Sequence, residues 1–194
     1  MKPLVTPAWI AAVAALVVGL ALPSSAQDED YSKLLASLRA TKLTLADGLA
    51  SVRPPAVPIS AKFELGDNPG HTLSLSVYVA ERGVNVGATH NRLDELLGDP
   101  TTSPWKPSTS PLVGVDLNEG LGQLTVAAQS RVSLLDIYKR AKADSGGTII
   151  SITATAFRGE HVFAVRAARS GTVSELLYNL KGTLVGQRGD DALQ

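Results

Sequence analysis

The chain has 194 residues, with 18 basic and 18 acidic side chains, no cysteine and 44% hydrophobic residues. The lack of cysteine excludes disulfides, thiolate metal sites and the attachment of haem or lipid through a thiol. The balanced charge argues against nucleic acid as a partner, because phosphate binding draws on clustered positive charge.

The first 26 residues have the pattern of a secretory signal peptide. Lys2 precedes an apolar stretch from Ala8 to Leu22, and small residues lead to Ala26. An uncleaved membrane anchor is the alternative, but the apolar run is shorter than the roughly 20 residues that span a bilayer and ends at Pro23. We therefore expect cleavage after Ala26, a periplasmic or extracellular location, and no stable membrane insertion afterwards.

Two helices are predicted at the start of the mature chain. Over residues 31–38 the apolar side chains recur at helical spacing, which predicts a short amphipathic helix. A second helix should begin at Thr44, with Asp47 completing a capping box, in which each residue bonds the other's backbone amide. Leu45, Leu49 and Val52 would form its buried stripe.

A hairpin should follow the proline-rich connector at 53–58. Apolar and polar residues alternate over 59–65 and again over 72–79, and the turn signal at 66–70 separates these runs. Residues 84–93 stand where a third strand would be expected, but they depart from the pattern that the second half of the chain keeps. The first unit, residues 27–97, therefore looks divergent.

The same order recurs in residues 131–185. Ser133 and Asp136 repeat the capping box, and Leu134, Tyr138 and Ala141 are expected to form the buried stripe. Strands are predicted for the ranges 148–157, around 163–167, 173–180 and 183–185. Residues 186–194 should form a polar tail that frays.

A capped helix followed by an antiparallel meander resembles the PepSY and PepSY-like family of exported domains. The resemblance is carried by Val132-Ser133-Leu134-Leu135-Asp136, by Phe163-Ala164-Val165 and by the closing segment from Leu177 to Val185. It implies an α+β fold with two related units, each a helix packed on a small antiparallel sheet. Members of this family inhibit or chaperone peptidases, or act as sensory and interaction domains, and they share no catalytic set.

Residues 98–130, between the units, are expected to form a proline-rich linker followed by a helix from about Leu117. Trp105 has two interpretations: its ring pins the linker onto the domain, or it is an exposed anchor for a partner. Because the first unit diverges after Gly83, we take Trp105, His90 and Arg92 as candidate partner-binding residues.

No reactive motif is recognisable. His71, His90 and His161 are far apart in sequence, without the usual local spacing for zinc. The pairs Asp94-Glu95 and Asp190-Asp191 fall in segments that look helical or tail-like, where solvation explains them. We expect no catalytic residue, metal or cofactor.

These patterns favour an exported, non-catalytic binding protein that pairs with a protein or peptide of the cell envelope. One alternative is a carrier of a small apolar ligand, since the small residues Ala154, Ala156, Ala164 and Ala167 would leave room for it. The other is a hydrolase whose Ser, His and Asp meet only in space.

Overall fold

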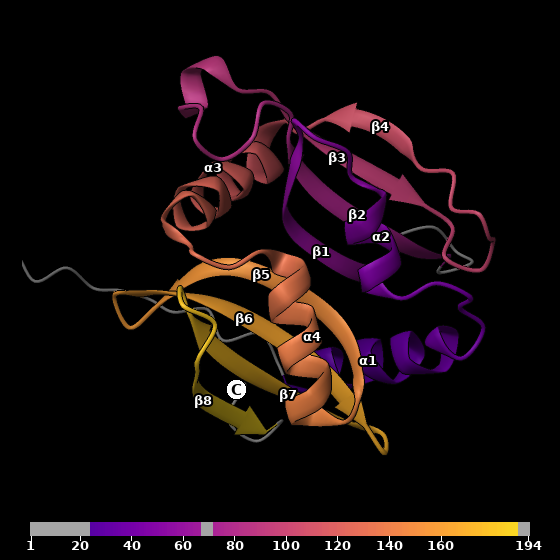
Figure 1. Cartoon of the computed structure of the whole chain (residues 1–194). Helices are drawn as coiled ribbons and strands as arrows, with labels where there is room; N and C mark the ends of the chain where they lie inside the picture. Colours follow the sequence, from indigo (N-terminus) through magenta and orange to yellow (C-terminus); the bar gives the residue numbers. More distant parts are fainter. Residues whose placement is uncertain (1–23, 67–71, 190–194) are drawn as a thin grey trace, which may run out of the picture.

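One eight-stranded antiparallel sheet, in the order β4-β3-β2-β1-β5-β6-β7-β8, organises the computed structural model (Figure 1). The structure describes residues 24–66 and 72–189, so most of the expected leader, His71 and the pair Asp190-Asp191 lie outside it. The strands are β1 Val57–Leu65, β2 Leu73–Ala80, β3 Leu93–Gly98, β4 Ser108–Pro111, β5 Thr148–Phe157, β6 Glu160–Arg169, β7 Thr172–Asn179 and β8 Leu184–Gly189.

Helices accompany the sheet, which confirms the predicted α+β class. They are α1 Ser24–Leu38, α2 Leu45–Ser51, α3 Gly114–Gln129 and α4 Leu134–Ser145, with a short 3-10 turn, η1 Ala88–His90. In Figure 1, α2 lies in front of β1 and β2, and α4 lies in front of β5 and β6. Each helix contacts the two strands behind it. Over the described residues, no helix combines the length and the apolar character that crossing a membrane requires.

Both predicted capping boxes are confirmed. The amide of Thr44 donates to Asp47 Oδ2 at 2.7 Å, and the amide of Asp47 donates back to Thr44 Oγ1 at 3.4 Å. At the start of α4, the amides of Ser133 and Asp136 each donate to the other's side chain at 3.1 Å. These bonds satisfy amides that the first turn of a helix leaves without a partner.

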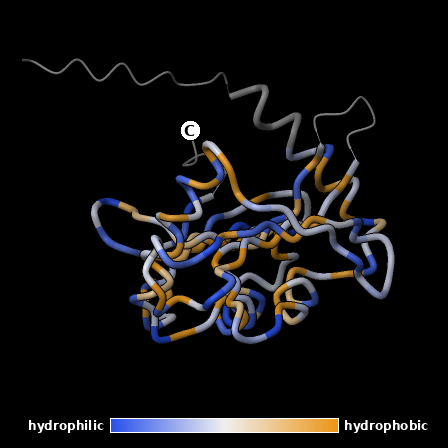
Figure 2. Tube along the Cα trace, turned by 90° about the horizontal axis from the view of Figure 1, so that it is seen from above, coloured by the Kyte–Doolittle hydropathy of each residue, from blue (hydrophilic) through white to orange (hydrophobic). Residues whose placement is uncertain are grey.

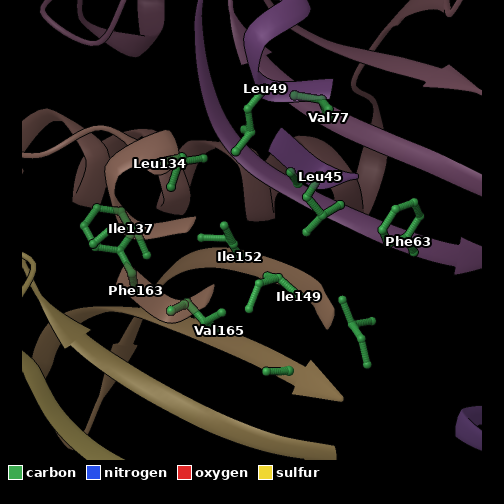
Figure 3. Packing of buried hydrophobic residues seen from close by; sticks show 14 of the residues in the cluster. Leu45, Leu49, Phe63, Val77, Leu134, Ile137, Ile149, Ile152, Phe163 and Val165 are labelled. Carbon is green, nitrogen blue, oxygen red and sulfur yellow. The ribbon is translucent and has the colours of Figure 1, made fainter. Parts of the chain in front are cut away.

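The main core lies between α2, α4 and the sheet (Figure 3). Leu134, Ile137 and Ala141 of α4 are buried, at the spacing i, i+3 and i+7 that defines one helical face. The prediction of Tyr138 at the centre of this stripe is wrong: Ile137 is fully buried there, and Tyr138 packs at the margin.

The two halves of the sheet meet at β1 and β5. Only three residue pairs join these strands: Ser60 with Thr153, Ala61 with Ile152 and Lys62 with Ser151. On one side of this junction, the pairing of β1 with β2 shifts register at Ile59. On the other side, the pairing of β5 with β6 shifts register at Ile150. Beyond the three pairs β1 and β5 no longer pair, although each continues along its other neighbour.

Helix α3 packs where β1 and β5 cease to pair. It contacts both strands and also β3. Leu124 of α3 joins a second, smaller core with Tyr78 and Leu93, while Val126 enters the main core. Since alternate strand residues point to opposite faces, Tyr78 and its neighbour Val77 lie on opposite faces of β2, and so do the two cores. In the view from above, apolar positions gather along the middle of the molecule (Figure 2).

Several sequence expectations for the middle of the chain need correction. Asp94-Glu95 is not helical but part of β3, because β3 pairs with β2 and β4 on its two sides. The divergent first half therefore does have a third strand, which begins at Leu93. The proline-rich segment contributes β4, and α3 begins at Gly114, three residues before Leu117.

At the end of the chain, β8 continues to Gly189, beyond the expected end at Val185. Its ladder with β7 holds the stretch that was expected to fray, since Glu175 pairs with Arg188 and Leu176 with Gln187. The polar sequence of 186–189 gave no sign of this, because an edge strand can be polar and still be paired on one side.

The caps yield a stability prediction. Ser133→Ala should lower the free energy of unfolding by about 1 kcal/mol at neutral pH, the usual loss for an N-cap hydroxyl, as measured by urea denaturation.

The bonds from Ser133 lower the pKa of Asp136. The folded carboxylate therefore contributes stability above its unfolded pKa of about 3.9, and this contribution is lost as pH falls through the lower folded pKa. The difference between wild type and variant should shrink in that acidic range. A difference that grows on acidification would contradict this account.

Candidate functional site

The two edge strands of the sheet differ in how they are protected. Strand β4 has four residues, all exposed, with Pro107 before it and Pro111 at its end. Proline has no amide proton and is a common device for preventing strand pairing at a sheet edge. Strand β8 has six residues and no proline, and no described strand lies beyond it. It is therefore the edge better suited to accept another strand.

The turn before β8 fixes the direction of the strand. Asn179 Oδ1 accepts bonds from the amides of Lys181 and Thr183, each at 3.0 Å. Gly182 adopts φ +76°, a conformation that glycine adopts without steric cost. Arg140 of α4 donates to the carbonyl of Gly182 at 2.5 Å, so the helix that covers the core also holds this turn.

An ionic cluster fixes the other end of β8. Arg188 forms an ion pair with Glu175 of β7, and Arg166 of β6 lies 3.8 Å from the same carboxylate. Glu175 is buried, with 6% of its surface exposed. The guanidinium of Arg188 also lies 4.6 Å from the centre of the Phe157 ring. The charge of Arg188 is thus directed back onto the sheet instead of guarding the outer edge.

Two apolar side chains on β8 are exposed although they are large. Leu184 is 40% exposed and Val185 is 56% exposed. Val185 lies at an irregularity, between the pair of Leu177 with Gly186 and the pair of Tyr178 with Leu184. An unguarded backbone edge with adjacent apolar side chains can accept an extended segment, because main-chain bonds give affinity and alternate side chains give selectivity. This chemistry requires no proton transfer or metal.

Trp105 packs inward onto the chain. Its ring is half-buried at the margin of the main core and lies against Gly98 at the end of β3. A Cβ atom at Gly98 would be 2.5 Å from Trp105 Nε1 and 3.0 Å from the Cα of Pro107. The absence of a side chain at Gly98 therefore lets the indole hold the proline-rich loop beside β4.

His90 and Arg92 are exposed and lie together near the start of β3, away from the core. His90 Nδ1 is 2.9 Å from Thr89 Oγ1, and Arg92 donates to Asp94 at 2.7 Å. That hydrogen bond and the charge of Asp94 raise the pKa of the Arg92 guanidinium. The structure therefore does not bring the three candidate residues into one site: His90 and Arg92 are each bonded to another neighbour, and Trp105 packs at the opposite end of β3.

The described histidines have neutral partners. His161 Nδ1 is 3.1 Å from Gln129 Oε1, as His90 is paired with Thr89. These contacts form no relay from a carboxylate through a histidine to a serine in the described parts of the chain. Nor do three or more histidine, aspartate or glutamate side chains gather there in a way that could hold a metal ion.

Sequence reasoning missed β8 as a candidate site because it treated this strand as the end of the second unit. The signal that could have found it is a comparison of the outermost strands: Pro107 and Pro111 flank one of them, whereas Leu184-Val185 in the other has no neighbouring proline. Which strands are outermost, however, is a property of the assembled sheet.

Comparisons with known proteins add little. No family model matches the chain, and no curated protein matches it. Among solved structures, a candidate lipoprotein from Clostridium difficile 630 matches with a TM-score of 0.35 and 12% identity, over 69% of this chain and 82% of the other. A likeness at this level does not bear on function.

The contact between Trp105 and Gly98 can be tested by substitution. Gly98→Ala should lower the free energy of unfolding by roughly 1–3 kcal/mol, as overpacking does, and should shift the fluorescence of Trp105 to longer wavelength. In the chain from Gln27, Trp105 is the single tryptophan, so urea denaturation followed by fluorescence reports on it directly. Gly87→Ala is the matched control, since a Cβ there meets nothing within 4 Å. Equal effects of the two changes would refute the packing role.

Proposed function

We propose that this chain is an exported, non-catalytic binding protein of the cell envelope, which takes an extended segment of a partner protein or peptide onto the free edge of β8. The observation that carries the proposal is the difference between the two sheet edges: prolines guard β4, while β8 is fixed in place but unguarded. The leader pattern supports the envelope location.

The chemistry of the edge defines the partner. Arg188 is paired with Glu175 on the sheet, so the outer edge of the strand offers backbone groups and two exposed aliphatic side chains. The expected segment is extended, aliphatic at alternate positions and without proline. Because the turn and the ion pair already order β8, binding does not require this strand to be ordered first, which reduces the entropic cost.

The same proposal includes two related, PepSY-like units. Each half of the chain has a capped helix, α2 or α4, followed in sequence by four strands that form a meander, and the innermost strands β1 and β5 pair antiparallel. This common order supports a duplication. With β1 and β5 joined at the centre, each unit would contribute one outer edge, and only the edge of the second half is free of proline.

An apolar carrier receives less support from the packing. Ala154 and Ala167, which were expected to leave room for a ligand, are buried within the main core among Ile152, Phe163 and Val165. The small side chains there let the helices approach the sheet closely, and Ala154 and Ala156 also border an open cleft between α3 and β5.

Panning a phage-displayed library of random heptapeptides against the chain from Gln27 tests the proposal. Peptides with aliphatic residues at alternate positions should be enriched. Val185→Lys should weaken their binding at least tenfold, because a charge buried without a partner beside the incoming strand costs more than about 1.4 kcal/mol.

Thr109→Lys on β4 is the matched control, since it places the same charge on the other edge, where all four residues are exposed. It should leave binding unchanged. Equal losses in both variants, or binding that survives Val185→Lys, would overturn the proposal. The other possible occupant of this edge is a second copy of the chain, and sedimentation of the wild type tests it. A dimer that Val185→Lys converts to monomer would show that β8 pairs with a second copy instead.

A further inference from the structure

A small pocket opens where the chain passes from its first half to its second. The connector between α3 and α4, residues 130–133, lies there beside the sheet (Figure 1). Val57 and Pro58 of β1 also line the pocket, together with Ala127 near the end of α3. Its volume is about 280 Å³, just below the usual range for drug-sized ligands, so it suits a smaller molecule.

The accessible wall of this pocket is apolar. Its half-buried apolar members keep part of their surface open to a ligand, and they are Val57, Pro58, Val84, Ala127 and Val132. Leu134 and Phe163 also belong to the lining but are 3% and 1% exposed, so they contribute little accessible surface. Covering the half-buried side chains removes apolar surface from water, which favours a ligand with a hydrocarbon body.

The hydroxyl groups of the lining are already used within the protein. Ser130 Oγ donates to the carbonyl of Val132 at 2.8 Å, and Ser133 Oγ donates to Asp136 Oδ2 at 2.7 Å. The amide of Arg131 donates to the carbonyl of Leu180 at 3.0 Å, which fixes the connector against the end of β7. These groups therefore leave the guanidinium of Arg131 as the polar group that can meet a ligand.

Arg131 is the charged residue of the described lining, and it is exposed. The acidic side chains nearest to the lining segments in sequence have other partners. Asp136 caps α4, where Lys139 and Arg140 of the same helix act on its charge, and Glu81 lies 3.7 Å from Arg92. The pocket thus combines an apolar wall with one available cation, which favours an anion and disfavours a second cation.

We propose that this pocket binds a short aliphatic monocarboxylate, with its carboxylate paired with Arg131 and its hydrocarbon chain against Val57, Pro58 and Ala127. A guanidinium matches a carboxylate with two parallel hydrogen bonds, which a hydroxyl or an ammonium group cannot form. The ligand would touch both halves of the chain. No residue of β8 belongs to the described lining, so this site and the β8 edge can fail independently.

Three probes of one chain length and different charge test the proposal: hexanoate, 1-hexanol and hexylamine. In an NMR titration of the chain from Gln27, hexanoate should produce saturable shifts of the amide signals of Ala127 and Val132. Hexanol should bind more weakly, and hexylamine more weakly still. Raising the ionic strength should weaken hexanoate binding and leave hexanol binding unchanged, because salt screens an exposed charge pair. Absence of saturable shifts with hexanoate, or equal affinity for hexanoate and hexanol, would overturn the proposal.

Arg131→Gln tests the recognition of charge. It should weaken hexanoate binding roughly two- to fivefold, the range for an exposed ion pair, and leave hexanol binding unchanged. Arg39→Gln makes the same charge change at an exposed position outside the lining and is the matched control. An equal loss in both variants, or no loss in Arg131→Gln, would show that Arg131 does not recognise the carboxylate.

Ala127→Leu tests the place of the hydrocarbon chain. The larger side chain should occupy the pocket and abolish saturable binding of hexanoate and hexanol alike. Ala128→Leu is the matched control, since it makes the same change at the next position of α3, which is exposed and outside the lining. Melting curves show whether each variant folds, and if Ala127→Leu does not, the exposed Arg131→Gln decides alone. Hexanoate binding that survives in folded Ala127→Leu would place the ligand elsewhere and refute the site.

Discussion

The short pairing of β1 with β5 is the constraint on which the rest of the structure depends. Three residue pairs make two four-stranded meanders into one sheet. So short a ladder would be weak alone, and the main core compensates because α2 and α4 contact each other and both contact β1 and β5. Leu45 and Leu49 from one half pack in one cluster with Leu134 and Ile137 from the other, so hydrophobic burial holds the halves together across the junction.

The shortness of this pairing also creates space. Because β1 and β5 stop pairing beyond Ser60 and Thr153, α3 can contact both strands and insert Val126 into the main core. On the side where α3 faces β5, hydroxyls and amides line a cleft that no described side chain fills. The junction of the halves and this cleft thus have one structural cause.

Two buried tyrosines connect the helices to the sheet on its opposite faces. Tyr78 donates to Asp116 of α3 at 3.2 Å, and Tyr178 donates to Asp144 of α4 at 2.7 Å. Burial, reinforced by these carboxylates, raises the pKa of both phenols. The hydroxyls therefore stay protonated, and remain donors, to a higher pH than the phenol of a free tyrosine.

The sequence by itself determined the features that depend on near neighbours. The capping boxes at Thr44 and Ser133 were predictable because their bonds join residues three apart. The strand over 148–157 followed from its alternation of apolar and polar residues, and α+β from the order of these elements. The prediction for Asp94-Glu95 was wrong for the opposite reason. A charged pair has no strand signal of its own, and these two residues belong to a strand because they pair with β2 and β4.

Tertiary structure alone decided which strands lie at the edges, that Trp105 packs onto Gly98, and that Gln123 borders a cleft. Each of these depends on contacts whose partners the sequence pattern does not specify. Ser60 pairs with Thr153 across 93 positions of sequence, and no local periodicity encodes that choice. It is fixed by which arrangement buries the apolar faces of both halves together, and this leaves β8 as the unguarded edge.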